Sequence, residues 1–142
     1  AEEMDATVAA RDGKRESFIV QAMAEPGSEL LVGVVEDPTF GPVLACGAGT
    51  QAELLKDVSV RVCPVTRGDV GQMLHALRTF PLLTGYRGAP LVDMGKLEEL
   101  LMRVSAMVDA HHEIAEMDLN PARQLLSAQS RSASASIRSR RS

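Results

Sequence analysis

The sequence predicts an α+β fold in which a mostly antiparallel sheet is packed by two helices and is followed by a disordered tail. Short apolar runs separated by Pro and Gly turns are typical of antiparallel strands. Two later segments carry apolar residues at helical spacing. The last 16 residues hold seven Ser and four Arg and no acid, which is typical of disorder.

The strand predictions rest on short apolar runs bounded by turn residues. Residues 17–23 (SFIVQAM), 29–36 (ELLVGVVE) and 42–47 (PVLACG) are predicted strands joined by short turns, and they suggest an antiparallel meander. Residues 58–62 (VSVRV) alternate cleanly between apolar and polar positions. They are therefore predicted to form a further strand, with Arg61 pointing outward.

The first predicted helix begins after Thr66, which is suited to cap it, with Asp69 at the third helical position. Its apolar residues recur at i, i+3, i+4 and i+7, so one face is expected to pack on the sheet. These residues are Val70, Met73, Leu74 and Leu77. Pro81 is expected to stop this helix, and residues 82–89 (LLTGYRGA) are expected to form a loop.

The longest predicted helix follows Asp93, which is its expected N-cap. Its apolar positions continue the helical spacing over three turns. They are Leu97, Leu100, Leu101, Val104, Met107 and Val108. His111 and His112 are expected to end the helix, because cations suit the negative end of the helix dipole.

Composition limits the classes of function. The chain has 142 residues, which suits one domain, and its net charge of −4 includes the basic tail, so the remaining body is acidic. Aromatic residues make up 3%, which disfavours a base-stacking nucleic-acid surface. Cys46 and Cys63 lack the spacing of a zinc site and are interpreted as buried free thiols in a reducing compartment. No apolar run has the length of a membrane span, so a cytoplasmic location is expected.

The segment 113–121 (EIAEMDLNP) combines a predicted strand with a polar stripe. Side chains two residues apart share a face of a strand, so Glu116, Asp118 and Asn120 are expected to line one face. Carboxylate and amide oxygens suit Mg²⁺, which takes one or two protein ligands and completes its shell with water and phosphate oxygens. Pro121 is expected to end the strand pairing. The alternative is a solvated edge strand with ordinary surface acids.

Gly47 and Gly49 (GAGT) precede a short helical or irregular segment. Glycines before a helix can let backbone N–H groups approach a phosphate. A plain turn is the alternative interpretation.

Five segments of the chain resemble, in the same order, the C-terminal part of the ATP-grasp domain of NDP-forming acyl-CoA synthetases. These segments are IVQAM, EPGSELLVGVVEDPTFGPVLACGAG, ELLKDVSVRV, LRTFPLLTGYRG and EIAEMDLNP. The family includes the ADP-forming acetate–CoA ligases and is related to succinyl-CoA synthetase. The resemblance implies a partial ATP-grasp domain over residues 1–126, forming one lobe of a clamp for ATP or ADP with Mg²⁺, and a separate tail over residues 127–142.

The resemblance also implies a reaction and a set of site residues. The reaction is acyl-CoA + ADP + phosphate ⇌ carboxylic acid + CoA + ATP, with phosphate passing through a phosphohistidine on another domain. Asn120 corresponds to a magnesium ligand, and Glu116 and Asp118 share its motif. The positions near the nucleotide are Gln21, Met23, Glu29, Gly47, Gly49 and Glu53. No residue of this chain is assigned as catalytic.

The chain also departs from the family pattern. The N-terminal lobe with its phosphate-contacting Lys is missing, and the stretch where the family carries a second metal-binding Asp has no acid here. One hypothesis is therefore a synthetase segment, inactive alone, that acts with a missing lobe or with a CoA-binding phosphohistidine subunit. Another is a truncated non-catalytic remnant or interaction module. A nucleic-acid contact through the tail is disfavoured, because four Arg supply few phosphate contacts and the body is acidic.

Overall fold

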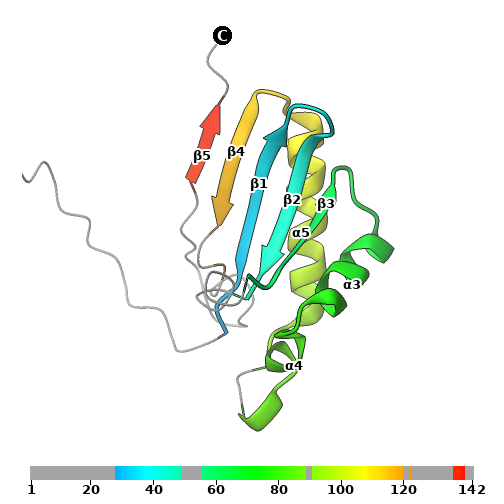
Figure 1. Ribbon diagram of the computed structural model, residues 1–142, viewed down its shortest axis with the longest axis vertical. Helices are drawn as coiled ribbons and strands as arrows, with labels where there is room; N and C mark the ends of the chain where they lie inside the picture. Colours follow the sequence, from blue (N-terminus) through cyan, green and yellow to red (C-terminus); the bar gives the residue numbers. More distant parts are fainter. Residues whose placement is uncertain (1–27, 49–55, 89–90, 120–121, 123–135, 140–142) are drawn as a thin grey trace, which may run out of the picture.

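The computed structural model describes residues 28–48, 56–88, 91–119, 122 and 136–139. Five antiparallel strands form one sheet in the order β3-β2-β1-β4-β5, with the described helices on one side of it (Figure 1). The strands are β1 (Leu31–Asp37), β2 (Gly41–Gly47), β3 (Val58–Val62), β4 (Ile114–Leu119) and β5 (Ser136–Ser139). The helices are α3 (Arg67–Ala76), α4 (Phe80–Leu83), the short 3-10 helix η1 (Tyr86–Gly88) and α5 (Met94–Ala110). The predicted α+β class is confirmed.

The core lies between the sheet and the helices α3 and α5. On β1, Val32 and Val34 are buried while Val35 is 53% exposed, as expected for a strand with one covered face. The helices contribute Val70, Met73, Leu74, Leu97, Leu101 and Val108 to the same cluster. The sheet therefore has a covered face toward these helices and an opposite face, called here the open face, over which no described helix lies (Figure 1).

The capping signals in the sequence form the predicted caps. The Asp69 N–H donates to the Thr66 hydroxyl at 3.2 Å, and the Thr66 N–H donates to the Asp69 carboxylate at 2.8 Å, which completes a capping box. The Lys96 N–H donates to Asp93 at 3.1 Å at the start of α5. His111 is the C-cap residue of α5, as predicted.

The expected end of the first helix at Pro81 is wrong. Helix α3 ends at Ala76, and Pro81 lies in the first turn of α4, where its missing N–H costs no helical hydrogen bond. The physical reason is a tertiary contact, because the N–H groups of Arg78 and Thr79 donate to Asp57 and leave the helical pattern. The predicted loop over residues 82–89 consequently begins within α4 and includes η1.

The expected outward orientation of Arg61 is also wrong. Arg61 pairs with the buried Leu44 and lies on the covered face, while Val58, Val60 and Val62 are 43%, 51% and 47% exposed on the open face. Apolar and polar residues alternate along β3 as predicted, but the valines are on the open face and Arg61 is on the covered face. Strand β3 is at the edge of the described sheet, so the Arg61 side chain can leave the covered face and donate to the Val60 carbonyl at 2.8 Å.

The tail departs from the predicted disorder at residues 136–139, which form β5 and pair with β4. The free edge of β4 offers unpaired N–H and C=O groups, and even a short segment of the tail can satisfy them. Strand β4 is therefore an inner strand of the described sheet, which contradicts its interpretation as an edge strand.

Beyond β4, the Ala122 N–H donates to the Leu30 carbonyl at 2.7 Å, so one sheet-like hydrogen bond forms past Pro121. The predicted strand over residues 17–23 lies outside the described residues.

Candidate functional site

The acidic stripe on β4 is present as predicted. Met117 and Leu119 are buried on the covered face, and Glu116 and Asp118 alternate with them on the open face. Adjacent positions on one face of a strand are roughly 6.5 Å apart, so the two carboxylates can approach one bound cation or its phosphate partner. Asn120, the third predicted metal-site residue, lies outside the described residues.

Two rungs of cross-strand pairs place the carboxylates beside an apolar surface. One rung runs from Val60 through Ala45 and Gly33 to Asp118. Gly33 and Ala45 carry almost no side chain, so this part of the open face lies low between the exposed valines of β3 and the carboxylate of β4. Glycine within a strand is typical of places where a ligand or backbone approaches closely.

The second rung runs from Val62 through Val43 and Val35 to Glu116. It continues to Arg138 of β5, whose guanidinium lies 3.4 Å from the Glu116 carboxylate. The two rungs together give the open face an apolar side on β3 and a charged side on β4 and β5.

Of the predicted nucleotide-binding positions, Glu29 and Gly47 are described. Gly47 ends β2 and pairs with Leu31, the first residue of β1, and Glu29 lies two residues before Leu31. Asp118 pairs with Gly33, so all three predicted residues gather toward one end of the sheet. The remaining predicted positions, Gln21, Met23, Gly49 and Glu53, lie outside the described residues.

The donor set on β4 fits a cation that takes few protein ligands. Within the described part of the chain, no three His, Cys, Asp or Glu side chains come together in a way that could hold a metal ion. A centre built from protein ligands alone is therefore not formed by these residues. Two carboxylates on one face do suit Mg²⁺, which commonly binds one or two carboxylates together with phosphate oxygens and water.

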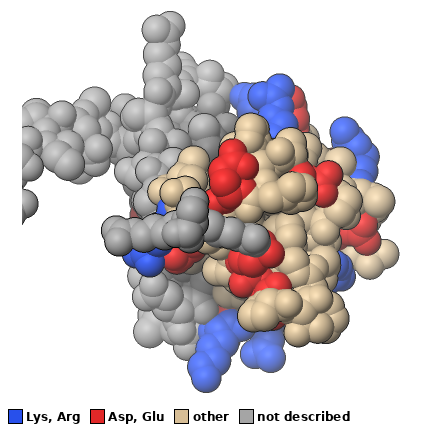
Figure 2. Space-filling model, turned by 90° about the horizontal axis from the view of Figure 1, so that it is seen from above, with Lys and Arg blue, Asp and Glu red and all other residues tan. Residues whose placement is uncertain are grey.

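The end of the sheet opposite Glu29 and Gly47 is mainly acidic. Figure 2 shows the molecule from the end of the sheet where β1 turns into β2. Acidic side chains occupy the central part of this surface, and Lys and Arg lie mainly at its edge. Asp37 ends β1, and Asp109 and Glu113 precede β4 at the same end. The view shows no continuous basic patch that would suit a polyanion such as nucleic acid.

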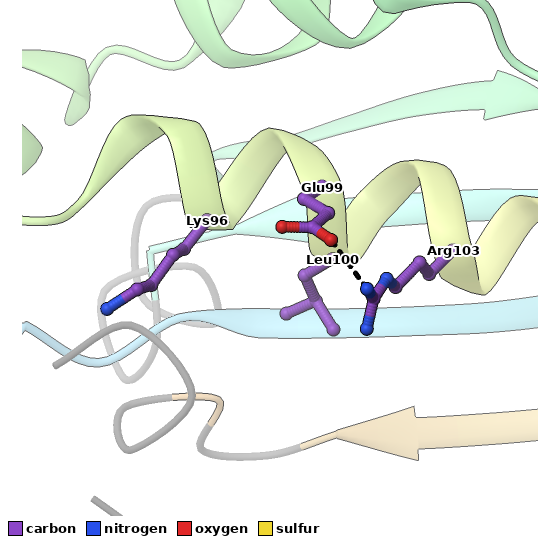
Figure 3. A pocket seen from close by; sticks show the side chains of 4 residues that line it. All are labelled: Lys96, Glu99, Leu100 and Arg103. Atoms are coloured by element: carbon purple, nitrogen blue, oxygen red, sulfur yellow. Dashed lines mark ion pairs between the residues drawn. The ribbon is translucent and has the colours of Figure 1, made fainter. Parts of the chain in front are cut away.

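A shallow pocket on α5 lies apart from this site. It is lined by Lys96, Glu99, Leu100 and Arg103 (Figure 3). Arg103 and Glu99 form an ion pair at 2.6 Å within it. The pocket belongs to the helical side of the sheet, and no residue predicted to bind nucleotide or metal lines it. The open face is therefore the candidate site.

Sequence reasoning missed two contributors to the open face. Arg138 was assigned to a disordered tail, although Ile137 and Arg138 show the start of an alternation that could have indicated a strand. The exposed valines of β3 were expected to face the core. The alternation in VSVRV identifies an apolar side of the strand but contains no signal for which side the helices cover.

Comparison with known proteins identifies the class to which this sheet and its carboxylates belong. Residues 1–132 match the ATP-grasp domain family, and the chain therefore belongs to that family. It is 42% identical over 107 residues to ADP-forming acetate–CoA ligase I of Archaeoglobus fulgidus, covering 75% of this chain and 16% of the ligase. It is 39% identical over 105 residues to the beta subunit of ADP-forming acetate–CoA ligase II of Pyrococcus furiosus, covering 72% of this chain and 44% of that subunit.

Solved structures agree in fold. Acetyl-coenzyme A synthetase 1 of Ca. Korarchaeum cryptofilum, in complex with coenzyme A and Ca-AMPCP, superimposes with a TM-score of 0.75 at 38% identity. The match covers 84% of this chain and 54% of that one. The same synthetase with coenzyme A and Mg-AMPPCP gives a TM-score of 0.66 at 42% identity over 69% of this chain and 46% of that one. The resemblance to the ATP-grasp domain of NDP-forming acyl-CoA synthetases is confirmed, and the chain spans less than half the length of the curated relatives described above.

No helix within the described ranges is both long enough and apolar enough to span a membrane.

Proposed function

We propose that the open face binds a nucleoside di- or triphosphate together with Mg²⁺, as part of an ADP-forming acyl-CoA synthetase. The observation that carries the proposal is the rung from Val60 through Ala45 and Gly33 to Asp118. Neighbouring strands are about 4.8 Å apart, so Val60 and Asp118 lie roughly 14 Å from each other across the sheet. An extended nucleotide has comparable length, with an apolar base at one end and charged phosphates at the other.

The chain's own residues then have distinct roles. Glu116, Asp118 and Asn120 hold the cation, and the low surface at Gly33 and Ala45 admits the ligand close to the sheet. The six positions proposed to bind the nucleotide are Gln21, Met23, Glu29, Gly47, Gly49 and Glu53. The Mg²⁺ held there would supply positive charge to neutralise the phosphate oxygens of the nucleotide. The rest of the contribution is positioning, since phosphoryl transfer depends mainly on alignment and electrostatic stabilisation.

The larger reaction is a proposal that extends beyond this chain. The Korarchaeum synthetase is described with coenzyme A, Mg-AMPPCP and a phosphohistidine segment pointing towards its nucleotide site. By analogy, this chain would work with a further lobe and a CoA-binding phosphohistidine subunit, moving phosphate between ADP or ATP and that histidine during acyl-CoA and carboxylate interconversion. The two buried free thiols agree with a reducing compartment, so we propose a cytoplasmic location.

A second candidate is a non-catalytic remnant or interaction module of the same fold. The observation that favours it is the ion pair between Arg138 and Glu116, because a cation occupies the neighbourhood of a proposed metal ligand. The exposed valines of β3 also agree with a surface that a partner covers.

Thermal unfolding of the purified chain separates the two candidates. We expect Mg²⁺ with ADP at a hundred times its dissociation constant to stabilise the chain by about 2.7 kcal/mol, which raises the midpoint by roughly 5–10 °C. The rise should need Mg²⁺ and should shrink in Asp118→Asn. Asp109→Asn is the matched control, because it removes the same charge from an exposed acid on α5. If nucleotide does not change the unfolding midpoint of the wild type or of either variant, binding at the open face is contradicted. The non-catalytic remnant is then favoured.

A further inference from the structure

Strand β5 brings a cation to the acidic stripe. Arg138 is the cross-strand partner of Glu116, and its guanidinium lies 3.4 Å from the Glu116 carboxylate. The two side chains are 84% and 50% exposed, so both are accessible from the open face. The contact joins a residue of the Ser/Arg-rich tail to one of the proposed metal ligands.

The two carboxylates of β4 consequently have different surroundings. Asp118 is opposite Ser136, and within the described ranges its carboxylate makes no hydrogen bond or ion pair. On the other side of Glu116 is Val35 of β1, which is apolar and cannot neutralise it. Arg138 is therefore the described cation that compensates Glu116, and Asp118 is left without a counter-ion in this part of the chain.

We propose that Arg138 is a specificity-determining residue of this site, which disfavours a bare divalent cation at Glu116 and favours a cation that arrives bound to a polyphosphate. This inference rests on the proposed function. A bare divalent cation is repelled by the guanidinium and must compete with it for the carboxylate. The complex of the same cation with a nucleoside diphosphate or triphosphate has a net negative charge, and its phosphate oxygens can accept hydrogen bonds from the free guanidinium N–H groups.

The expected size of the effect follows from the exposure of the pair. Exposed ion pairs are weak, and a divalent cation doubles the interaction of a single charge. Removing Arg138 should therefore tighten binding of the bare cation by roughly two- to ten-fold at low ionic strength. The difference should shrink as salt is added, because added ions screen exposed charges.

The experiment measures two ligands on the 142-residue chain and its variants. Binding of Mn²⁺ alone is followed by electron paramagnetic resonance, and binding of ADP in the presence of Mn²⁺ by equilibrium dialysis. The variants are Arg138→Gln and the double variant Arg138→Gln with Glu116→Gln. The control is Arg103→Gln, because Arg103 is 77% exposed and forms a comparable ion pair with Glu99 on α5, away from the open face.

We expect Arg138→Gln to bind Mn²⁺ alone more tightly while its affinity for Mn²⁺-ADP stays equal or falls. The double variant should lose the gain, and Arg103→Gln should change neither affinity. Unchanged Mn²⁺ binding in Arg138→Gln, or no Mn²⁺ binding in any protein, would overturn the inference. An equal gain in affinity for Mn²⁺ alone and for Mn²⁺-ADP in Arg138→Gln would also overturn the inference. Arg138 would then compete equally with both ligands for Glu116 and would not select between them. If the Mn²⁺ difference is present but no protein binds nucleotide, the proposed function fails and with it the selection of the complex, while the screening of Glu116 stands.

Discussion

The backbone N–H of Thr79 donates a hydrogen bond of 2.8 Å to the carboxylate of Asp57, 22 residues earlier in the chain. The N–H of Arg78 donates to the other carboxylate oxygen at 2.9 Å, and the Thr79 hydroxyl donates as well. Asp57 is 6% exposed, so these contacts are shielded from water. They join the residue before β3 to the segment between α3 and α4, and they decide where α3 ends.

Removing this carboxylate should be costly. Asp57→Ala leaves three donors without their acceptor, and we expect the free energy of unfolding to fall by about 2–4 kcal/mol. Asp57→Asn keeps one acceptor and should lose less. Urea unfolding measures the difference, with the exposed Asp109→Ala as the control, expected within about 0.5 kcal/mol of the wild type. Equal losses in the Asp57 and Asp109 variants would contradict the buried contact.

The same carboxylate predicts a pH dependence. Desolvation raises the pKa of Asp57, but the donors from Thr79 and Arg78 outweigh it and hold the pKa below its ordinary value of 3.8. The folded chain then binds fewer protons at Asp57 than the unfolded chain does, so the stabilisation is complete above about pH 4 and is lost as the pH falls through the folded-state pKa. The gap in unfolding free energy between wild type and Asp57→Asn should therefore narrow in acid. A gap that stays constant or widens below pH 4 would rule out this assignment.

Neighbouring residues on β1 test which face of the sheet is covered. Val34 is 1% exposed and Val35 is 53% exposed. Val34→Ala removes buried methyl groups and should lower the free energy of unfolding by about 2 kcal/mol. Val35→Ala should cost less than about 1 kcal/mol, because its side chain leaves little cavity. Equal costs in urea unfolding would show that both faces of β1 are covered in solution.

The capping box at the start of α3 gives a further stability prediction. Thr66→Ala removes the hydroxyl that accepts the Asp69 N–H and should cost about 1–2 kcal/mol. Gln72→Ala, at an exposed position inside the same helix, serves as the control and should be close to neutral, because Ala is a good helix former. Chemical denaturation followed by circular dichroism measures both. A neutral Thr66→Ala would argue against the cap.

The thiols should be unreactive in the folded chain. Burial raises the pKa of Cys46 to about 12, and its side chain is fully buried. Desolvation also raises the pKa of Cys63. This effect outweighs the hydrogen bond with Ser105, which lowers the pKa. Labelling with a disulfide reagent at pH 8 should be more than about 100-fold slower than in concentrated guanidinium chloride, where both thiols react. Single Cys→Ala variants assign each signal, and rapid labelling of the folded Cys46→Ala chain would show that Cys63 is open to solvent.

The helices show how far local sequence determines the fold. Thr66 and Asp93 cap α3 and α5 as predicted, because a cap depends on residues within one turn of the chain. The end of α3 could not be predicted in this way. It depends on Asp57, which lies far from Arg78 and Thr79 in sequence and meets them once β3 and α3 have packed.

In the candidate site, too, local sequence predicts one part and the tertiary structure decides the other. The shared face of Glu116 and Asp118 follows from the two-residue period of an extended chain, and the structure places both on the open face. The neighbours of these carboxylates depend on strand order and register, which bring Gly33 beside Asp118 and Arg138 beside Glu116. No local pattern in the sequence contains that information.

The sequence by itself determined strands β1 to β4, the two packing helices, their caps and the acidic stripe on β4, since each depends on periodicity or on contacts within a few residues. The tertiary structure alone decided that the valines of β3 face outward, that Arg61 occupies a position on the covered face, and that residues 136–139 complete the sheet. The physical reason is that alternation of apolar and polar residues assigns side chains to two faces of a strand but does not indicate which face is covered. The covered face is chosen when helices α3 and α5 pack against the sheet and bury Val34, Leu44 and Met117 together.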